Sequence, residues 1–393
     1  MSFVSGLSCV VCGHQADAPT SRGTCPACQD PFCTLEVEFD MERVRGALTR
    51  EALAKRPITH WRYHELLPVE PDASVFSWPV GGSPILESPR LASWAGIAGF
   101  RLKDDTRNPT LSFKDRASSV GVLHALQQGA ERIACASTGN AASSLAGYAA
   151  MAQMPATIFI PQNAPEPKVV QMQLYGADVR RVQGTYDEAY ELCNQECEKH
   201  GWYNRNCAIN PYLVEGKKTC GLEIAEQTAS NPPDWVAVSV GDGCSVAGIA
   251  KGLAEMHELG FLSRLPRILA VQSAAVDPLA RAFETGQLPA DISGETIADS
   301  IDVPTPRNWH KAIQRVRQLN GIFVRVTDDE IFAAMKACGE LAGVLAEPAA
   351  AASVAGVRRA IADGKISSTE NVVAVITGNG LKDIRSAAKV VAG

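Results

Sequence analysis

The chain has 393 residues, of which 46% are hydrophobic and 20% are charged, with 32 glycines and 23 prolines; this composition fits a globular protein and excludes disordered, collagen-like and coiled-coil chains. At this length we expect two domains, or one two-lobed unit with an appendage. The net charge of -6, from 37 Lys and Arg against 43 Asp and Glu, comes without a long basic run and argues against a nucleic-acid partner.

No segment of the sequence predicts insertion into a membrane or export. The longest apolar stretches, such as AASSLAGYAAMA, are shorter than the roughly 20 residues of a membrane span. The N-terminal segment MSFVSGLSCVVCGH has no basic start followed by a long apolar stretch. We therefore expect a cytoplasmic protein without membrane attachment, whose 12 cysteines are reduced or bind metal.

Residues 1–34 have the pattern of a small zinc ribbon. The sequence C-x2-C-x12-C-x2-C contains two pairs of thiolates that can bind one tetrahedral ion, and its cysteines are Cys9, Cys12, Cys25 and Cys28. Four incidental apolar cysteines are the alternative, which the doubled spacing in a Gly- and Pro-rich segment disfavours. Because four ligands close the coordination shell, we expect a structural Zn2+ that stabilises the ribbon.

Residues 35–75 are expected to form an N-terminal arm, with a helical pattern over about residues 36–67. The stretch MERVRGALTREALAK has the spacing of an amphipathic helix, which Pro57 would end.

From residue 76 onward, short β-rich runs alternate with longer helical patterns. The predicted strands are residues 132–136, 156–160, 235–240, 267–273, 321–326 and 371–377. Apolar strands separated by helices favour parallel sheets covered on both faces, so the expected fold class is α/β. The loops that follow such strands lie at the edge of a sheet where ligands bind.

Two of these loops precede predicted helices. Residues 137–140 (Ser137, Thr138, Gly139 and Asn140) offer N–H groups and hydroxyls to a carboxylate at the positive end of a helix dipole, although an ordinary N-cap explains them equally well. Residues 241–245 (GDGCS) contain glycines that let the backbone approach a phosphate closely. Because Gly248 is misplaced for G-x-G-x-x-G, a single phosphate fits better than a pyrophosphate.

A lysine and a threonine complete this set of groups. Lys114 is expected in the first turn of a helix, where the dipole favours a nucleophilic amine; a solvated lysine flanked by Asp115 and Arg116 is the alternative. Thr377 places a hydroxyl at the end of the last strand, where a plain Gly-rich strand end is as good an explanation. A nucleophilic lysine, a monophosphate loop, a carboxylate loop and a strand-end hydroxyl together are what pyridoxal phosphate and an amino acid require.

Five motifs, in this order and spacing, resemble the threonine synthase family of the tryptophan-synthase-β-like, fold type II pyridoxal-phosphate enzymes: NPTLSFKDRAS, CASTGNAASSLAGYAA, INPYLVEGKKTCGLEIAEQ, EPAAAASVAG and ITGNGLKD. The resemblance covers roughly residues 60–385, and related members also carry an N-terminal zinc ribbon. We accordingly expect two α/β lobes with the site in the cleft between them, the large domain being residues 76–114 and 216–393 and the small domain residues 115–215. We also expect a small amino-acid substrate and a homodimer.

The resemblance implies a role for each of these residues. Lys114 would bind the cofactor covalently and then shuttle protons, Asn140 would hydrogen-bond the cofactor's 3′-oxygen, and Thr377 would face the pyridine nitrogen. The substrate carboxylate would be held by Ser137, Thr138 and Gly139. The cofactor phosphate would be held by the backbone amides of Gly241, Asp242, Gly243, Cys244 and Ser245. A neutral hydroxyl at the ring nitrogen suits elimination and replacement more than transamination.

Three positions depart from the family pattern. Where the family holds the substrate phosphate with Asn, Ser and Arg, this chain has Asp242, Ala208 and Leu213, which removes charge-assisted hydrogen bonds to a dianion. We therefore expect O-phosphohomoserine to be a poor substrate and a neutral or cationic leaving group, contacted by Asp242, to be preferred. The alternative is that Lys168 or Arg307 supplies the missing charge. The role of Asn379, where the family often has histidine, stays open.

Four functions follow from this sequence. The first is the family reaction, O-phosphohomoserine plus water to threonine plus phosphate. The second is β- or γ-elimination or replacement on a non-phosphorylated amino acid, as in an ammonia-lyase or dehydratase. The third is a non-catalytic binding protein that combines a zinc ribbon with an inactive pyridoxal-phosphate fold; the presence of Lys114 and the intact loops argues against it. The fourth and most distant is a nicotinamide oxidoreductase.

Overall fold

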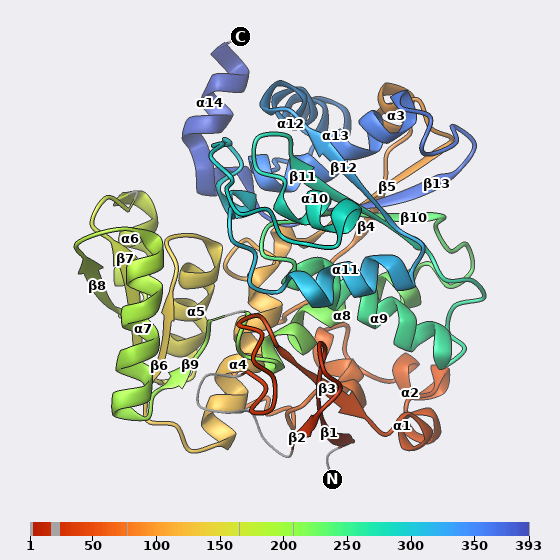
Figure 1. Cartoon of the computed structure of the whole chain (residues 1–393). Helices are drawn as coiled ribbons and strands as arrows, with labels where there is room; N and C mark the ends of the chain where they lie inside the picture. The colour runs from red at the N-terminus through yellow and green to blue at the C-terminus, as the bar shows by residue number, and fades with distance from the viewer. Residues whose placement is uncertain (1–2, 17–23, 77, 165, 207, 393) are drawn as a thin grey trace. The chain divides into compact units, whose positions relative to one another are not determined.

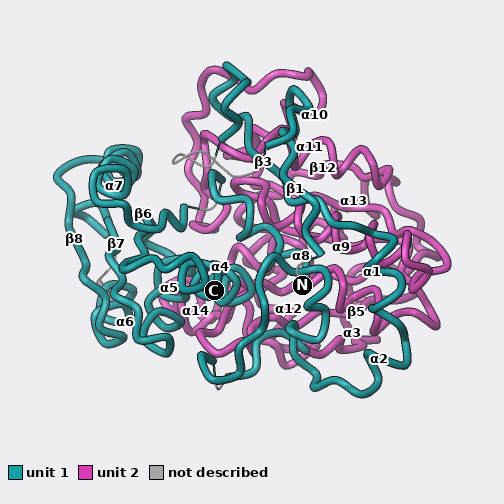
Figure 2. The backbone as a smooth tube through the Cα atoms, turned by 90° about the horizontal axis from the view of Figure 1, so that it is seen from below, with its two compact units in different colours: residues 1–82, 114–219 teal, residues 83–113, 220–393 magenta. Residues whose placement is uncertain are grey.

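The structure is a computed structural model that describes residues 3–16, 24–76, 78–164, 166–206 and 208–392 (Figure 1). The chain divides into two units: residues 1–82 with 114–219 form unit 1, and residues 83–113 with 220–393 form unit 2 (Figure 2). Each unit contains its own largely or wholly parallel sheet with helices packed on it, which confirms the predicted α/β class.

Unit 1 starts with an antiparallel sheet in the order β2-β1-β3, made of β1 (Val4–Cys9), β2 (Gln15–Ala16) and β3 (Leu35–Phe39). The helical prediction for the arm was therefore wrong for its first residues, because the β3 sequence LEVEF pairs with β1 and buries its apolar side chains. The predicted amphipathic helix is also divided into α1 (Met41–Ala47) and α2 (Arg50–Ala54). The hydroxyl of Thr49 accepts a hydrogen bond from the Ala52 N–H and caps α2, so a new helix begins there. The 3-10 helix η1 (His60–Leu66) follows.

The second sheet of unit 1 is parallel and has the order β8-β7-β6-β9. Its strands are β6 (Ile133–Ala136), β7 (Ala156–Pro161), β8 (Asp178–Val182) and β9 (Tyr203–Asn204). Its helices are α4 (Lys114–Gln127), α5 (Asn140–Met151), α6 (Glu166–Leu174) and α7 (Tyr186–His200), and α8 (Tyr212–Gln227) begins in this unit. Ile133 and Cys135 of β6 pack with α4 and α5, whereas Ala134 packs with α7, so helices cover both faces (Figure 1).

Unit 2 contains a six-stranded sheet in the order β12-β11-β10-β13-β5-β4. The strands are β4 (Ile85–Glu87), β5 (Gly99–Asp104), β10 (Trp235–Ser239), β11 (Arg267–Ser273), β12 (Ile322–Val326) and β13 (Asn371–Ile376). All pairs are parallel except β4 with β5, an antiparallel edge that the sequence did not predict.

Helices pack on this sheet from both sides. A large apolar core joins one face to α3 (Pro89–Ala95), α12 (Asp328–Ala342) and α13 (Pro348–Ala362), while α9 (Cys244–Glu258) and α11 (Trp309–Gln318) pack on the other (Figure 1). The remaining elements are η2 (Asp105–Arg107), α10 (Pro278–Thr285), η3 (Asp299–Ile301), η4 (Gly380–Asp383) and α14 (Ile384–Ala392). Among the described residues, no helix is both long and apolar enough to cross a bilayer.

Candidate active site

The segment that precedes Lys114 is hydrogen-bonded to the end of β13. The Phe113 N–H donates to the Thr377 carbonyl at 2.8 Å, and the Asn379 N–H donates to the Leu111 carbonyl at 3.1 Å. These bonds extend the sheet beyond its last strand residue. Thr377, which is half-buried, therefore lies beside Phe113, the residue that immediately precedes Lys114.

The backbone that follows β13 is also hydrogen-bonded on its other side. The Glu347 N–H donates to the Gly378 carbonyl at 3.0 Å, and the buried Glu347 carboxylate occupies the space that a Cβ at position 378 would need. Only glycine fits there without a shift of Glu347. The side chain of Asn379 accepts a hydrogen bond from the Leu381 N–H at 3.0 Å and caps η4, which gives this residue a structural role.

Lys114 is the first residue of α4, as the sequence predicted, and is half-buried. Its two neighbours Asp115 and Arg116 are fully buried, and Arg116 Nη1 donates to Thr219 Oγ1 at 2.9 Å. The two flanking charges are therefore part of the interior, while Lys114 itself keeps partial access to solvent. Burial, and next the Asp115 carboxylate, raise the pKa of the Tyr148 phenol in α5, so the start of α4 lies near α5.

Residues 137–140 connect β6 to α5. The Gly139 N–H donates to Ser137 Oγ at 3.2 Å, and the buried Asn140 begins the helix. Gly139 is the N-cap and no side chain caps α5, in contrast to α7 and α12, which Thr185 and Thr327 cap. The alternative of an ordinary side-chain N-cap is thus wrong here, and the positive end of the α5 dipole remains suited to a carboxylate.

Residues 241–245 connect β10 to α9. Gly243 is the N-cap of α9 with a φ of 91°, and a Cβ at this position would lie 2.7 Å from Ala312 Cβ. A Cβ on Gly241 would lie 2.9 Å from the Ser300 carbonyl oxygen. Because no side chain caps α9 either, backbone donors and the helix dipole favour an anion at this loop, and the donor set fits the phosphate of pyridoxal phosphate.

The carboxylate of Asp242 contacts other residues of unit 2. Its Oδ1 accepts a hydrogen bond of 2.6 Å from the Arg307 N–H, and its Oδ2 lies 3.5 Å from the Cys244 sulfur. The carboxylate thereby fixes Arg307 beside the glycine loop. In unit 1, Leu213 is fully buried against Gly121 of α4, so this position is part of the interior.

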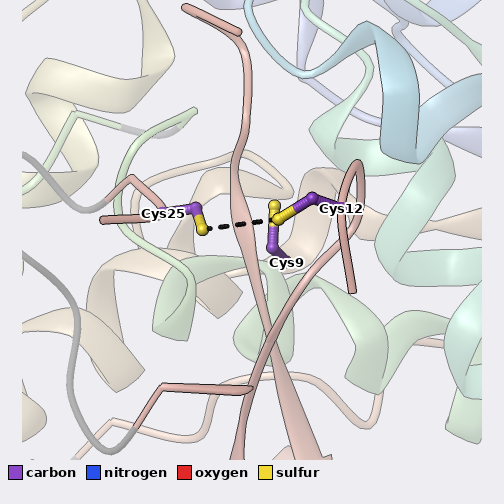
Figure 3. Close-up of side chains that lie close together, drawn as sticks. All are labelled: Cys9, Cys12 and Cys25. Carbon is purple, nitrogen blue, oxygen red and sulfur yellow. Dashed lines mark hydrogen bonds between the residues drawn. The ribbon is translucent and has the colours of Figure 1, made fainter. Parts of the chain in front are cut away.

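The cysteines of the N-terminal segment form a thiol cluster (Figure 3). The sulfurs of Cys9, Cys12 and Cys25 lie within 4.8 Å of one another, with 3.8 Å between those of Cys12 and Cys25. The sulfurs of Cys9 and Cys25 each lie 3.4 Å from the amide nitrogen two residues later, as expected when the chain turns around a ligand. Cys28 is half-buried and lies outside this group of three. Thiols are the donors that zinc prefers, so the cluster fits that ion.

The predicted residues gather within each unit. In unit 2, Thr377 and the glycine loop follow β13 and β10, which are neighbouring parallel strands. In unit 1, Lys114 and Asn140 begin α4 and α5, which pack together. Sequence reasoning missed Asn206 and Tyr186, whose side chains bind the backbone just before residue 137. The asparagines of the stretch NRNCAIN were the only signal for Asn206, and Tyr186 had none.

Comparisons with known proteins identify the family of this chain. The family profile described as pyridoxal-phosphate dependent enzyme matches residues 77–378. The threonine synthase of Methanosarcina acetivorans is 36% identical over 380 residues, 96% of this chain and 92% of its own. That of Methanocaldococcus jannaschii is 35% identical over 95% of this chain and 92% of its own.

Solved structures are similar in fold. Threonine deaminase isoform 2 from Solanum lycopersicum has a TM-score of 0.69 at 24% identity, covering 79% of this chain and 82% of its own. Diaminopropionate ammonia lyase from Escherichia coli has a TM-score of 0.70 at 17% identity, covering 87% of this chain and 92% of its own.

Proposed function

The chain belongs to the pyridoxal-phosphate-dependent enzymes and, among them, to the threonine synthase family, and from this premise we propose that it converts O-phosphohomoserine and water into threonine and phosphate. The observation that carries the proposal is the 36% identity to a threonine synthase over 96% of this chain. The hydrogen bond between Phe113 and Thr377, which holds the residue before Lys114 at the strand end, is consistent with it. When bound, pyridoxal phosphate supplies an electron sink that stabilises negative charge on substrate carbons.

The residues of unit 2 would hold the cofactor's two ends. The backbone amides of residues 241–245, at the uncapped start of α9, would bind its phosphate. The hydroxyl of Thr377 would hydrogen-bond the pyridine nitrogen without forcing it to carry a proton, because a hydroxyl, unlike a carboxylate, has no negative charge.

The residues of unit 1 would hold and deprotonate the substrate. Lys114 Nζ would bond to the cofactor and, once released, move protons from Cα and Cβ and onto the product. Asn140 would orient the cofactor ring through its 3′-oxygen. Ser137, Thr138 and Gly139 would bind the substrate carboxylate at the uncapped start of α5, where the helix dipole favours negative charge.

Arg307 is our candidate for the cation that binds the substrate phosphate. The Asp242 carboxylate fixes the Arg307 backbone beside the glycine loop at 2.6 Å, and a guanidinium there would replace donors that positions 208, 213 and 242 lack. A second function stays supported by a specific observation: position 208, where the family has a serine, is a buried alanine that offers no hydrogen bond to a phosphate.

We further propose that Cys9, Cys12, Cys25 and Cys28 bind one structural Zn2+. The three clustered sulfurs support this, and the half-buried Cys28 would supply the fourth ligand. We also propose a homodimer, which sedimentation would test, and a cytoplasmic location, which cell fractionation would test. Limited proteolysis would test the proposed division of the chain into residues 1–34, 35–75, 76–114 with 216–393, and 115–215.

The decisive experiment for the function uses the full-length protein loaded with pyridoxal phosphate. We expect a visible absorbance band that borohydride bleaches, and release of phosphate and threonine in equal amounts from O-phosphohomoserine. Serine and threonine are the comparison substrates: release of ammonia from them, with no phosphate from O-phosphohomoserine, would establish the second function instead.

A further inference from the structure

The strand that leads to the Ser137 loop extends beyond its neighbour. β6 pairs with β9 only at Ile133 with Tyr203 and at Ala134 with Asn204. The last residue of β6, Ala136, therefore directs its N–H and carbonyl toward a side of the sheet where no strand continues. Because Ala136 is buried, these two groups need partners other than water.

Two side chains provide those partners. Asn206 Oδ1 accepts a hydrogen bond from the Ala136 N–H at 2.9 Å, and the Tyr186 hydroxyl donates to the Ala136 carbonyl at 3.3 Å. Asn206 is buried and Tyr186 begins α7. The side-chain amide of Asn206 thus takes the place of the missing strand at the residue before Ser137.

The orientation of the Asn206 amide is determined by its surroundings. Its Nδ2 donates to Asn194 Oδ1 at 3.1 Å, and its main-chain N–H donates to Asn204 Oδ1 at 2.9 Å. Asn204 Nδ2 donates to the same Asn194 oxygen at 2.9 Å. Because an amide has one oxygen and one NH2 group, the bond to Asn194 leaves the Asn206 oxygen to face Ala136.

From this arrangement we propose that Asn206 is a positioning residue for residues 137–139, the loop that would bind the substrate carboxylate. Tyr186 would contribute to the same positioning to a smaller extent. The start of α5 has no side-chain cap, and the hydrogen bonds at Ala136, together with the bond from the Ser137 N–H to the Phe159 carbonyl, hold the side of the loop that follows β6. A small displacement of the loop would weaken binding of the carboxylate but not of the amine. The inference rests on the proposed function, which assigns the carboxylate to this loop.

The test compares the affinity for a ligand that has the carboxylate with the affinity for a ligand that lacks it. Cofactor-loaded protein is titrated with L-threonine and with its decarboxylated counterpart 1-aminopropan-2-ol, and binding is followed by the cofactor's absorbance. For Asn206→Ala we expect the Kd for threonine to rise about tenfold or more and the Kd for the amine to stay within about twofold. For Tyr186→Phe we expect a smaller rise, for threonine only.

Thr157→Ala is the matched control. Thr157 is a fully buried polar residue of β7 that accepts a hydrogen bond from Arg132, and it lies near the start of that strand rather than at the loop. This variant should bind both ligands as the wild type does. Equal weakening of both ligands in Asn206→Ala, or an unchanged Kd for threonine, would overturn the proposal.

Hydrogen exchange of the protein without cofactor gives a second readout. The amides of residues 137–140 should exchange at least tenfold faster in Asn206→Ala than in wild type or Thr157→Ala, and unchanged rates contradict the positioning role. If wild-type protein shows no spectral response to threonine, the proposed function fails, and the exchange rates then decide alone whether Asn206 holds this loop. If Asn206→Ala does not fold, both measurements are made on Tyr186→Phe instead.

Discussion

The backbone N–H of Phe113 donates a hydrogen bond of 2.8 Å to the carbonyl oxygen of Thr377. These residues are 264 positions apart in the chain, yet each adjoins a group that the chemistry requires, the Lys114 amine and the Thr377 hydroxyl. Because the bond is between backbone groups, it does not depend on the polarity of the side chain at position 113, which is a fully buried phenylalanine. The bond, which lies within unit 2, therefore holds the residue immediately before Lys114 at the end of β13.

Lys114→Ala should remove the visible absorbance of the bound cofactor and reduce turnover to the limit of detection. The same amine binds the cofactor and carries the protons, so no other residue replaces it. Circular dichroism should show an unchanged fold, because Lys114 is a half-buried first residue of its helix. Turnover near the wild-type rate in this variant would refute the assignment.

Thr377→Ala should raise the Kd for pyridoxal phosphate about two- to tenfold, because one neutral hydrogen bond contributes roughly 0.5–1.5 kcal/mol. The measurement is a fluorescence titration of the protein without cofactor. Thr327→Ala in the same unit is the control: it removes the cap of α12, which lowers the free energy of unfolding by about 1 kcal/mol and leaves cofactor affinity unchanged. Complete loss of activity in well-folded Thr377→Ala would mean a larger role for this residue.

The parts of this fold that the sequence predicted are those with a strong local signal. β6, β10 and β11 are short apolar runs followed by small residues, and both candidate loops lie after such strands. β8 and β5 were missed because DVRRV and GFRLKD carry charges that mask the apolar pattern. The partners of Ala136 and of Gly378 could not be predicted at all, since those contacts arise between segments distant in the chain.

Purified protein that has met no chelator should contain one zinc ion per chain by elemental analysis. Cys9→Ser should lose most of that zinc, and hydrogen exchange should accelerate in residues 3–16 and 24–39 more than in α4 or α9. Cys33→Ser is the control, because Cys33 is equally buried nearby and its sulfur faces the carbonyls of Cys25 and Cys28. Wild-type protein without zinc would exclude the site.

Acid should destabilise unit 1 through His124. Burial lowers the pKa of this imidazole from 6.5 to about 4, and its Nδ1 lies 2.9 Å from the Tyr203 hydroxyl. Because the folded pKa is the lower one, the unfolded chain binds the proton first. The stabilisation is therefore complete above pH 6.5 and is lost as the pH falls toward 4, by up to roughly 3 kcal/mol. The free energy of unfolding in urea should fall more steeply across this window in wild type than in His124→Asn, and parallel profiles would contradict the assignment.

The last prediction concerns the leaving group and rests on the bond of 2.6 Å between the Arg307 N–H and the Asp242 carboxylate. If the Arg307 guanidinium binds the substrate phosphate, Arg307→Gln should raise the KM for O-phosphohomoserine about ten- to a hundredfold with little change in kcat, because a charge-assisted hydrogen bond contributes roughly 1.5–3 kcal/mol. Arg317→Gln is the control, since this exposed arginine donates to the Phe283 carbonyl at a distance from the glycine loop.

Phosphate release by the wild type decides between the two functions. A KM in the micromolar range for O-phosphohomoserine, together with its selective increase in Arg307→Gln, would show that Arg307 compensates for the apolar residues at positions 208 and 213. If O-phosphohomoserine yields no phosphate while a non-phosphorylated amino acid is turned over, the second function is established, in agreement with the buried Ala208, which offers no hydrogen bond to a dianion. Equal KM values for wild type and Arg307→Gln, with phosphate released by both, would leave the reaction in place and assign the cation to another residue.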